Sequence, residues 1–307
     1  MTAPPLGAAT VRRVLVPFAL VTLIWGSTWL VIRDQIGVVP VSWSVTYRFV
    51  VATVAMFAVA VATRVPIRIG RGGIAIAALV GVCQFFANFN LVYRAEAVVT
   101  SGLVAVVFGL LVVPNAILGR VLLGQSLSRP FLAGSAVALV GVALLFDHEL
   151  RQAGSGADTL AVVGGIALTA AAVLAASIAN VVQAMPAARR FPVLPLIAWA
   201  MLFGTIVDAL YAWATVGPPV FEPRWRYVAG ITYLGLAGSA LAFPLYFQVI
   251  RTIGPARAAY SSVLVPIIAM ALSTAFEGYR WSVQSGAGAA LALVGLVVAL
   301  RARNPAR

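Results

Sequence analysis

Two charged residues, Arg48 and Asp208, stand inside long apolar runs of the sequence and are the first candidates for chemistry. Arg48 lies in the run 41–62 and Asp208 in the run 193–216. At about 1.5 Å per helical residue, they sit about 10 Å and about 12 Å from the nearer ends of these runs. A charge at the centre of a membrane helix costs about 2.5–3.5 kcal/mol, so each needs a partner, water or a function.

Several roles are open to this pair. In the functional interpretation, Arg48 holds the carboxylate of a substrate, while Asp208 meets an ammonium group or takes a proton. In the structural alternatives, Arg48 extends to the interface or caps helix carbonyls, and Asp208 bonds a neighbouring helix end or faces an outer vestibule. The two side chains could also pair with each other. Asp208 is the only acid that we place inside a span, so it is the only evident proton site.

Uncharged polar side chains recur at helical spacing within other apolar runs. They are Gln84 with Asn88, Ser177 with Asn180 and Gln183, and Thr22 with Trp25 and Trp29. Amides that face lipid are costly, so these faces should look inward. They could bond helices together, but three such stripes in one chain favour a hydrated pathway for a small polar solute.

Aromatic residues and prolines form the last group of candidates. Trp199, Tyr246 and Tyr260 lie deep in apolar runs, where they could stack on an apolar side chain or a cation, or simply pack. Pro114, Pro244 and Pro266 each remove a backbone hydrogen bond inside an expected helix, and act either as gating hinges or as static bends.

The composition indicates that these residues belong to a membrane protein. The chain of 307 residues is 62% hydrophobic and 9% charged, with a mean hydropathy of +1.03. That apolar surface exceeds what a soluble domain keeps from water. Ten runs approach the ~20 residues that span a bilayer. They cover residues 14–32, 41–62, 73–92, 97–119, 130–146, 159–182, 193–216, 227–250, 255–276 and 282–300.

An internal duplication organises these runs. The stretch Ala95 to Phe146 and the stretch Ile253 to Leu300 share one plan: an apolar run with a proline, a short polar break and a closing apolar helix. Residues 1–146 are therefore expected to form one five-helix repeat and residues 159–307 a second, joined by a linker at 147–158. Because five is odd, the second repeat enters from the opposite side, and inverted repeats place a substrate site between them near the midplane.

The arginines predict the orientation in the membrane. One set of loops, which includes both termini, holds 14 arginines and no acid, whereas the other set holds six arginines and seven acids. By the positive-inside rule, both termini face the cytoplasm, in a bacterial inner membrane. The net charge of +13 is spread over these loops rather than gathered on one face, so it does not indicate nucleic-acid binding.

A family resemblance supports this interpretation. The chain resembles the EamA-like branch of the drug/metabolite transporter superfamily in Leu23-Ile24-Trp25-Gly26-Ser27-Thr28, in Tyr47-Arg48-Phe49, and in the two repeated stretches, with Glu277 and Gly288 at the family's Glu and Gly positions. Gln125 departs from the Glu often found in the first repeat. The resemblance implies ten helices and export of small metabolites, with aromatic and neutral amino-acid exporters as the most similar branch.

The sequence thus predicts an all-α membrane protein of ten helices around a central cavity, working as a monomeric secondary transporter by alternating access. Its expected partners are the lipid bilayer and a small neutral metabolite such as an amino acid, with protons as an optional coupling ion. The alternatives are a carrier of sugars, nucleosides or drugs, or a channel. With one His, one Cys and no nucleotide-binding loop, we expect no cofactor, no metal site and no enzyme activity; His148 is expected in a solvated loop.

Overall fold

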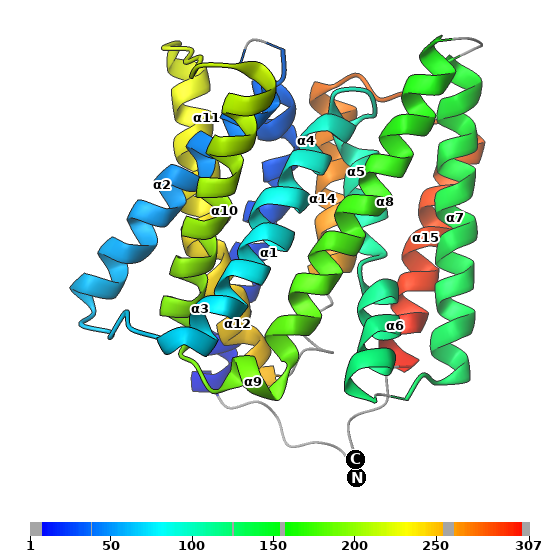
Figure 1. Cartoon of the computed structure of the whole chain (residues 1–307). Coiled ribbons are helices and arrows are strands. Elements are labelled where there is room, and N and C mark those ends of the chain that lie inside the picture. Colours follow the sequence, from blue (N-terminus) through cyan, green and yellow to red (C-terminus); the bar gives the residue numbers. More distant parts are fainter. Residues whose placement is uncertain (1–7, 38, 125, 154–156, 254–260, 303–307) are drawn as a thin grey trace.

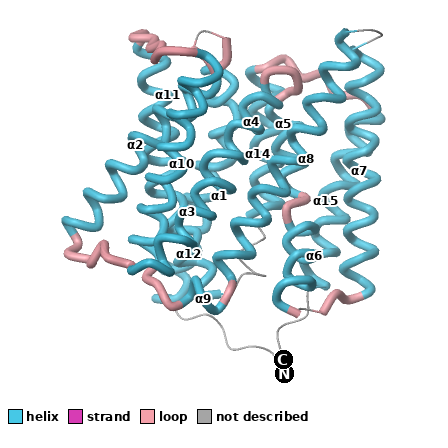
Figure 2. Tube along the Cα trace, in the orientation of Figure 1, coloured by secondary structure: helices cyan, strands magenta, loops and turns pink. Residues whose placement is uncertain are grey.

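A bundle of helices makes up the whole of the described chain (Figure 1). The computed structural model describes residues 8–37, 39–124, 126–153, 157–253 and 261–302. Helix α1 begins and helix α15 ends at the same end of the bundle, which we call the termini end; the junction between α7 and α8 lies at the opposite end, which we call the far end. Loops lie at these two ends, with an interruption between α5 and α6 inside the bundle (Figure 2).

The first half of the chain is built from helices of unequal length. They are α1 (Ala8–Gln35), α2 (Val41–Ala62), α3 (Gly70–Val80), the π-helical segment η1 (Gly81–Asn88), α4 (Phe89–Glu96), α5 (Ser101–Gly109), α6 (Val112–Leu123) and α7 (Arg129–Ala153). Helices α3, η1 and α4 run on as one apolar span, Gly70–Glu96. A π-helical stretch has one extra residue in its turn and is common at functional sites.

The second half follows a similar order. Its elements are α8 (Ala157–Ala184), α9 (Pro186–Arg189), α10 (Val193–Val216), α11 (Trp225–Gly235), the π-helical segment η2 (Leu236–Leu241), α12 (Ala242–Ile253), α14 (Ser261–Phe276) and α15 (Val283–Ala302). As in the first half, a π-helical segment interrupts the third long helix.

Within the described residues, the apolar runs of the sequence lie mainly in helices, in agreement with a multi-pass membrane protein. Eight helical spans in the described residues are long and apolar enough to cross a bilayer, and two shorter apolar helices cover Leu264–Phe276 and Val283–Ala299. The expected single helix over 97–119 is in fact broken between Gly109 and Val112.

The expected linker at 147–158 is wrong in extent. Helix α7 continues through Asp147 and His148 to Ala153, and α8 begins at Ala157. His148 is therefore buried rather than solvated, and its Nδ1 lies 3.1 Å from the Ser282 hydroxyl. The polar composition of this stretch indicated a loop, but Asp147 and Arg151, one helical turn apart, form an ion pair of 2.8 Å that suits a helix end.

Helices α7 and α15 pack closely against each other through glycines. A Cβ atom added at Gly141 would lie 2.3 Å from the Ala292 nitrogen, and one added at Gly295 would lie 2.3 Å from the Ala138 nitrogen. Backbones can approach this closely only where a side chain is missing, as in helix pairs of membrane proteins generally. This pair forms one flank of the bundle (Figure 1).

Candidate functional site

A cavity of about 870 Å³ occupies the interior of the bundle and is the candidate substrate site. Residues from α1, η1, α8 and α12 line it together with α2, α5, α6 and α14. Those that carry the argument below are Trp25, Trp29, Arg48, Gln84, Asn88 and Asn180. Its size lies within the range of sites that hold small ligands, about 300–1,000 Å³.

Arg48 is the charged group at the centre of this site. Its side chain is 2% exposed and lines the cavity. Its Nε donates to the Ser239 hydroxyl at 3.1 Å, and its guanidinium carbon lies 4.3 Å from the centre of the Phe89 ring. Its Nη1 has no hydrogen-bond partner within the described part of the chain. One donor of a buried cation is therefore free to meet a ligand.

Ser239 reaches Arg48 because of the π-helical backbone of η2. The Ser239 hydroxyl donates to the Leu234 carbonyl five residues earlier, at 2.9 Å, and accepts from Arg48 with a lone pair. Beside it, a Cβ at Gly238 would lie 3.0 Å from Thr28 Cγ2 and 3.4 Å from Arg48 Nη2. The carbonyl of Gly238 also accepts from Trp25 Nε1 at 3.2 Å.

Aromatic rings form the apolar side of the cavity. Trp25 packs against Tyr246 with ring centres 4.9 Å apart and against Phe243 at 5.5 Å. Trp29 packs on Phe108 at 5.2 Å. Trp29 Nε1 is buried and lacks a partner among the described residues, which makes it a second free donor on the lining.

The predicted amide stripes do face the cavity. Gln84 and Asn88 project from η1, where Gln84 Nε2 lies 3.5 Å from Asn88 Oδ1, and Asn88 Nδ2 donates to the Ala172 carbonyl of α8 at 2.9 Å. Asn180 lines the cavity from α8, together with Gln183. Asn88 therefore joins two helices and also lines the cavity.

The cavity is open at one end and closed at the other. Toward the termini end its lining includes Arg189, which is exposed, in α9. Toward the far end the last lining residues are Ile32 and Val92. Glu96, one helical turn beyond Val92, is fully buried. Among the described lining residues, Arg48 and Arg189 are charged and none is acidic.

A group of polar side chains closes the far end, and the sequence interpretation missed it. Glu96 is 0% exposed at the end of α4, and Arg33 of α1 donates to its backbone carbonyl. Glu277, just after α14, accepts from the Ser101 hydroxyl at 2.5 Å and the Ser273 hydroxyl at 2.6 Å. In the sequence analysis both acids count among the seven acids of the outer loops. The connection between Glu96 and Ser101 is short and mostly apolar. Such a loop cannot extend far into solvent, and this could have indicated that Glu96 stays inside the bundle.

Two predicted pathway residues lie away from the cavity. Trp199 donates from Nε1 to the Ile67 carbonyl at 2.8 Å and contacts Phe57 and Phe203 on the outside of α10. Asp208 is 0% exposed and accepts from Asn90 Nδ2 at 2.6 Å, so it bonds α10 to α4 and does not pair with Arg48. Neither lines the cavity in this conformation. Tyr260 lies outside the described residues.

The three prolines occupy different positions from those expected. Pro114 is in the first turn of α6, just after the break at 110–111, and Pro244 is in the first turn of α12, just after η2. In the first turn of a helix that follows a break, as for Pro114, a missing N–H costs little, whereas Pro244 lies inside the continuous span Trp225–Tyr246. Pro266 lies inside α14 and lines the cavity.

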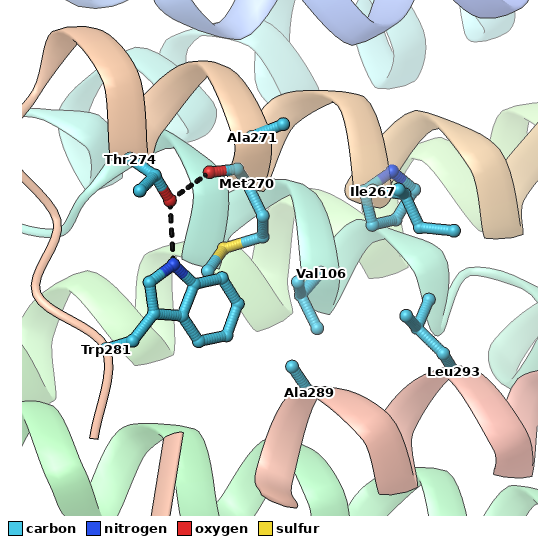
Figure 3. Close-up of a pocket in the computed structure, with 9 residues that line it drawn as sticks. Val106, Ile267, Met270, Ala271, Thr274, Trp281, Ala289 and Leu293 are labelled. Atoms are coloured by element: carbon cyan, nitrogen blue, oxygen red, sulfur yellow. Dashed lines mark hydrogen bonds between the residues drawn. The ribbon is translucent and has the colours of Figure 1, made fainter. Parts of the chain in front are cut away.

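A second pocket of about 450 Å³ lies between α14 and α15, with Pro266 also in its lining (Figure 3). Val106, Met270, Ala289 and Leu293 give it apolar walls, and the Trp281 indole donates to the Thr274 hydroxyl at 2.9 Å at one end. With so few polar groups, this pocket suits hydrocarbon, and we do not assign the polar substrate to it.

A multi-pass helical bundle around a large cavity with both polar and aromatic lining residues is typical of a membrane transporter. Comparison with known families gives the same result. The model of the EamA-like transporter family matches residues 14–147 and 163–301, so the chain belongs to this family. The family consists of transporters, which agrees with the expectation that the chain is not an enzyme.

Similar proteins cover the whole chain at low identity. Protein PagO of Salmonella typhimurium is 23% identical over 287 residues, which are 94% of this chain and 92% of that protein. A probable amino-acid metabolite efflux pump of the same organism is 25% identical over 300 residues, 94% of this chain and 96% of that protein. A protein of known crystal structure shares the fold with a TM-score of 0.68 and 20% identity, covering 95% of this chain and 98% of that chain.

Proposed function

We propose that this protein is a secondary transporter that exports small neutral metabolites, with amino acids as the substrate class. In this proposal ten helices form two inverted five-helix repeats, residues 1–146 and 159–307, which alternate access to the central cavity. The termini face the cytoplasm of a bacterial cell, and the protein works in the inner membrane as a monomer. The name of the similar efflux pump supports the direction and the substrate class.

The observation that carries the proposal is the unsatisfied guanidinium of Arg48 in a cavity lined by no described acid. Arg48 Nη1 and Trp29 Nε1 are both buried donors without a described partner. Two donors suit a carboxylate, which has only acceptors. A charge-assisted hydrogen bond inside a low-dielectric site is stronger than a neutral one, so Arg48 is the anchor for the carboxylate of an amino acid.

The rest of the lining suits the other parts of such a substrate. Amide oxygens accept from an ammonium group, and the Asn115 Oδ1 on the lining is buried with no described partner. The aromatic faces of Trp25 and Phe108 also attract a cation and pack against an apolar side chain. A zwitterion with an apolar or aromatic side chain therefore fits the mixture of polar and aromatic groups.

The positions of the two π-helical segments support the repeat. Segment η1 begins at Gly81 in the third long helix, and η2 begins at Leu236 in the third long helix after α7. This separation is close to the offset of the repeated Leu-Val-Gly motifs, Leu139-Val140-Gly141 and Leu293-Val294-Gly295. Irregular backbone at membrane depth is tolerated where it lines a cavity, and inverted repeats often place it on both sides of the site.

A transport assay with Arg48→Gln tests the proposal. Purified protein in liposomes would be offered labelled amino acids, nucleosides and sugars in counterflow. We expect saturable exchange of a neutral amino acid by the wild type and a loss of at least about tenfold in apparent affinity with Arg48→Gln, because one charged contact contributes about 1.5–3 kcal/mol. The control is Arg226→Gln, whose side chain is 82% exposed and pairs with Asp34.

Normal amino-acid exchange by a well-folded Arg48→Gln protein would refute the assigned role. A preference for carboxylates without an amino group would favour a second candidate, an organic-anion carrier, which is consistent with the lack of a described acid in the lining. Ohmic current without saturation would indicate a channel instead.

A further inference from the structure

The carboxyl group of Glu96 is buried and has no hydrogen-bond partner among the described residues. It lies one helical turn beyond Val92, at the closed end of the cavity. The residue is 0% exposed, and neither carboxyl oxygen has a hydrogen-bond partner within the described ranges. A charge that is taken out of water without hydrogen bonds costs several kcal/mol or more, and a carboxylate avoids that cost by binding a proton.

The charged neighbours of Glu96 do not supply the missing compensation. Glu277 is its strongest electrostatic partner and repels a negative charge there, while Arg33 and Arg48 attract one more weakly. Arg33 is exposed, and its guanidinium donates to the Glu96 backbone carbonyl rather than to the carboxyl group. Arg48 already bonds Ser239.

The other elements packed around Glu96 add no further described charge. Tyr93 on the same helix bonds Gln35, with the two oxygens 3.3 Å apart. Helix α8 meets this region through Gly165, which faces Val98 and Val99. The start of α5 contributes Thr100 and Ser101, and Ser101 is committed to Glu277.

Of the two acids, Glu277 has hydrogen-bond donors that Glu96 lacks among the described residues. Glu277 accepts from the Ser101 nitrogen at 3.3 Å, the Ser101 hydroxyl at 2.5 Å and the Ser273 hydroxyl at 2.6 Å, and such donors stabilise a carboxylate. Two carboxyl groups that interact closely share one charge more readily than they carry two.

We propose that Glu96 is a proton-binding site whose occupancy closes the far end of the transporter. With that end closed, the carboxyl group is neutral; when it opens, water reaches Glu96, the O–H bond breaks, and the proton leaves to that side of the membrane as the carboxylate forms. The proposal rests on alternating access. Because the closed state holds one proton more, closure is favoured as the pH falls and lost as it rises, by up to about tenfold in the open-to-closed ratio per pH unit.

A distance measurement across the far end tests this without any substrate. Spin labels would be placed on cysteines at Ala97 and Arg280, both exposed and next to Glu96 and Glu277 in turn, in a Cys83→Ser background. We expect the wild type in lipid nanodiscs to shift from a short distance in acidic buffer to a longer one in alkaline buffer. Glu96→Gln and Glu96→Leu, both permanently neutral, should keep the short distance throughout.

The control is Glu222→Gln, another acid of the far end that pairs with Arg224, and it should respond as the wild type does. A wild-type distance that does not depend on pH, or a pH response that persists in both Glu96 variants, would overturn the proposal. Arg48→Gln separates this result from the transport function: it should weaken substrate exchange by at least about tenfold in apparent affinity and still show a distance that depends on pH.

Discussion

Removing the hydroxyl of Ser239 should disturb substrate binding without touching the substrate. In Ser239→Ala, Arg48 Nε loses the acceptor that lies 3.1 Å away, and the contact with the Phe89 ring at 4.3 Å is left to hold the guanidinium. A hydrogen bond to a charged group contributes about 1.5–3 kcal/mol. If that energy serves to orient Arg48, the affinity for a carboxylate falls by about 10- to 100-fold.

The assay for this prediction is exchange in proteoliposomes, with KM and the maximal rate measured separately. Ser239→Ala should raise KM and leave the maximal rate within about threefold, since binding loses more than the conformational step does. Ser239→Thr keeps a hydroxyl and should restore most of the affinity. An unchanged KM in Ser239→Ala, at an unchanged unfolding temperature, would show that Ser239 does not orient the guanidinium for substrate.

Two further predictions concern packing and buried polarity. Gly141→Val should destabilise the protein by about 1–3 kcal/mol or more in thermal unfolding, because the new side chain meets the α15 backbone. Gly286→Val on α15 should be tolerated, since a Cβ there has nothing within 4 Å. Equal effects of the two substitutions would contradict the role of the α7–α15 contact. Asn90→Leu should destabilise the protein by about 1–3 kcal/mol, because Asp208 loses its hydrogen-bond donor. Asp208→Asn keeps an acceptor oxygen and should fold. A lower unfolding temperature for Asp208→Asn than for Asn90→Leu would argue against this bond.

Much of this architecture could be predicted from the sequence because lipid imposes simple rules on it. A helix satisfies its own backbone, so each long apolar run had to be helical. The cost of burying a guanidinium likewise marked Arg48, and the structure places it on the cavity with Gln84, Asn88 and Asn180. In these cases the free-energy cost of burial depends on the residue type alone, so it can be recognised from the sequence.

The remaining features depend on partners that are distant in sequence. Asp208 and Arg48 have the same kind of signal, yet one carboxyl oxygen of Asp208 accepts from Asn90, 118 positions away, and Asp208 lies off the cavity. Glu96 is the opposite case, a residue that the sequence did not mark as buried. It is next to a predicted loop, but α1, α5 and the end of α14 lie around it. The π-helical turns also escape prediction, since Gly81–Asn88 carries no local residue pattern that differs from an α-helix.

The bundle has a tightly packed flank of regular helices, α7 and α15, and an interior that includes π-helical segments. Helices α7 and α15 meet at backbone distance through glycines, which leaves little freedom to separate without losing contact along their length. Some of the groups that face the cavity belong to irregular elements or interact with them: η1 presents Gln84 and Asn88, Ser239 of η2 accepts from Arg48, and α14 contains Pro266.

This arrangement follows from the solvent. In a bilayer, a segment that leaves regular helical hydrogen bonding must be shielded from lipid, so irregular backbone and unsatisfied polar side chains gather in the same protected place. The cation on α2 and the hydroxyl that orients it on η2 come from opposite repeats of the proposed duplication. Any movement between the repeats must therefore change this bond, which makes the Arg48–Ser239 contact sensitive to the state of the transporter as well as to its substrate.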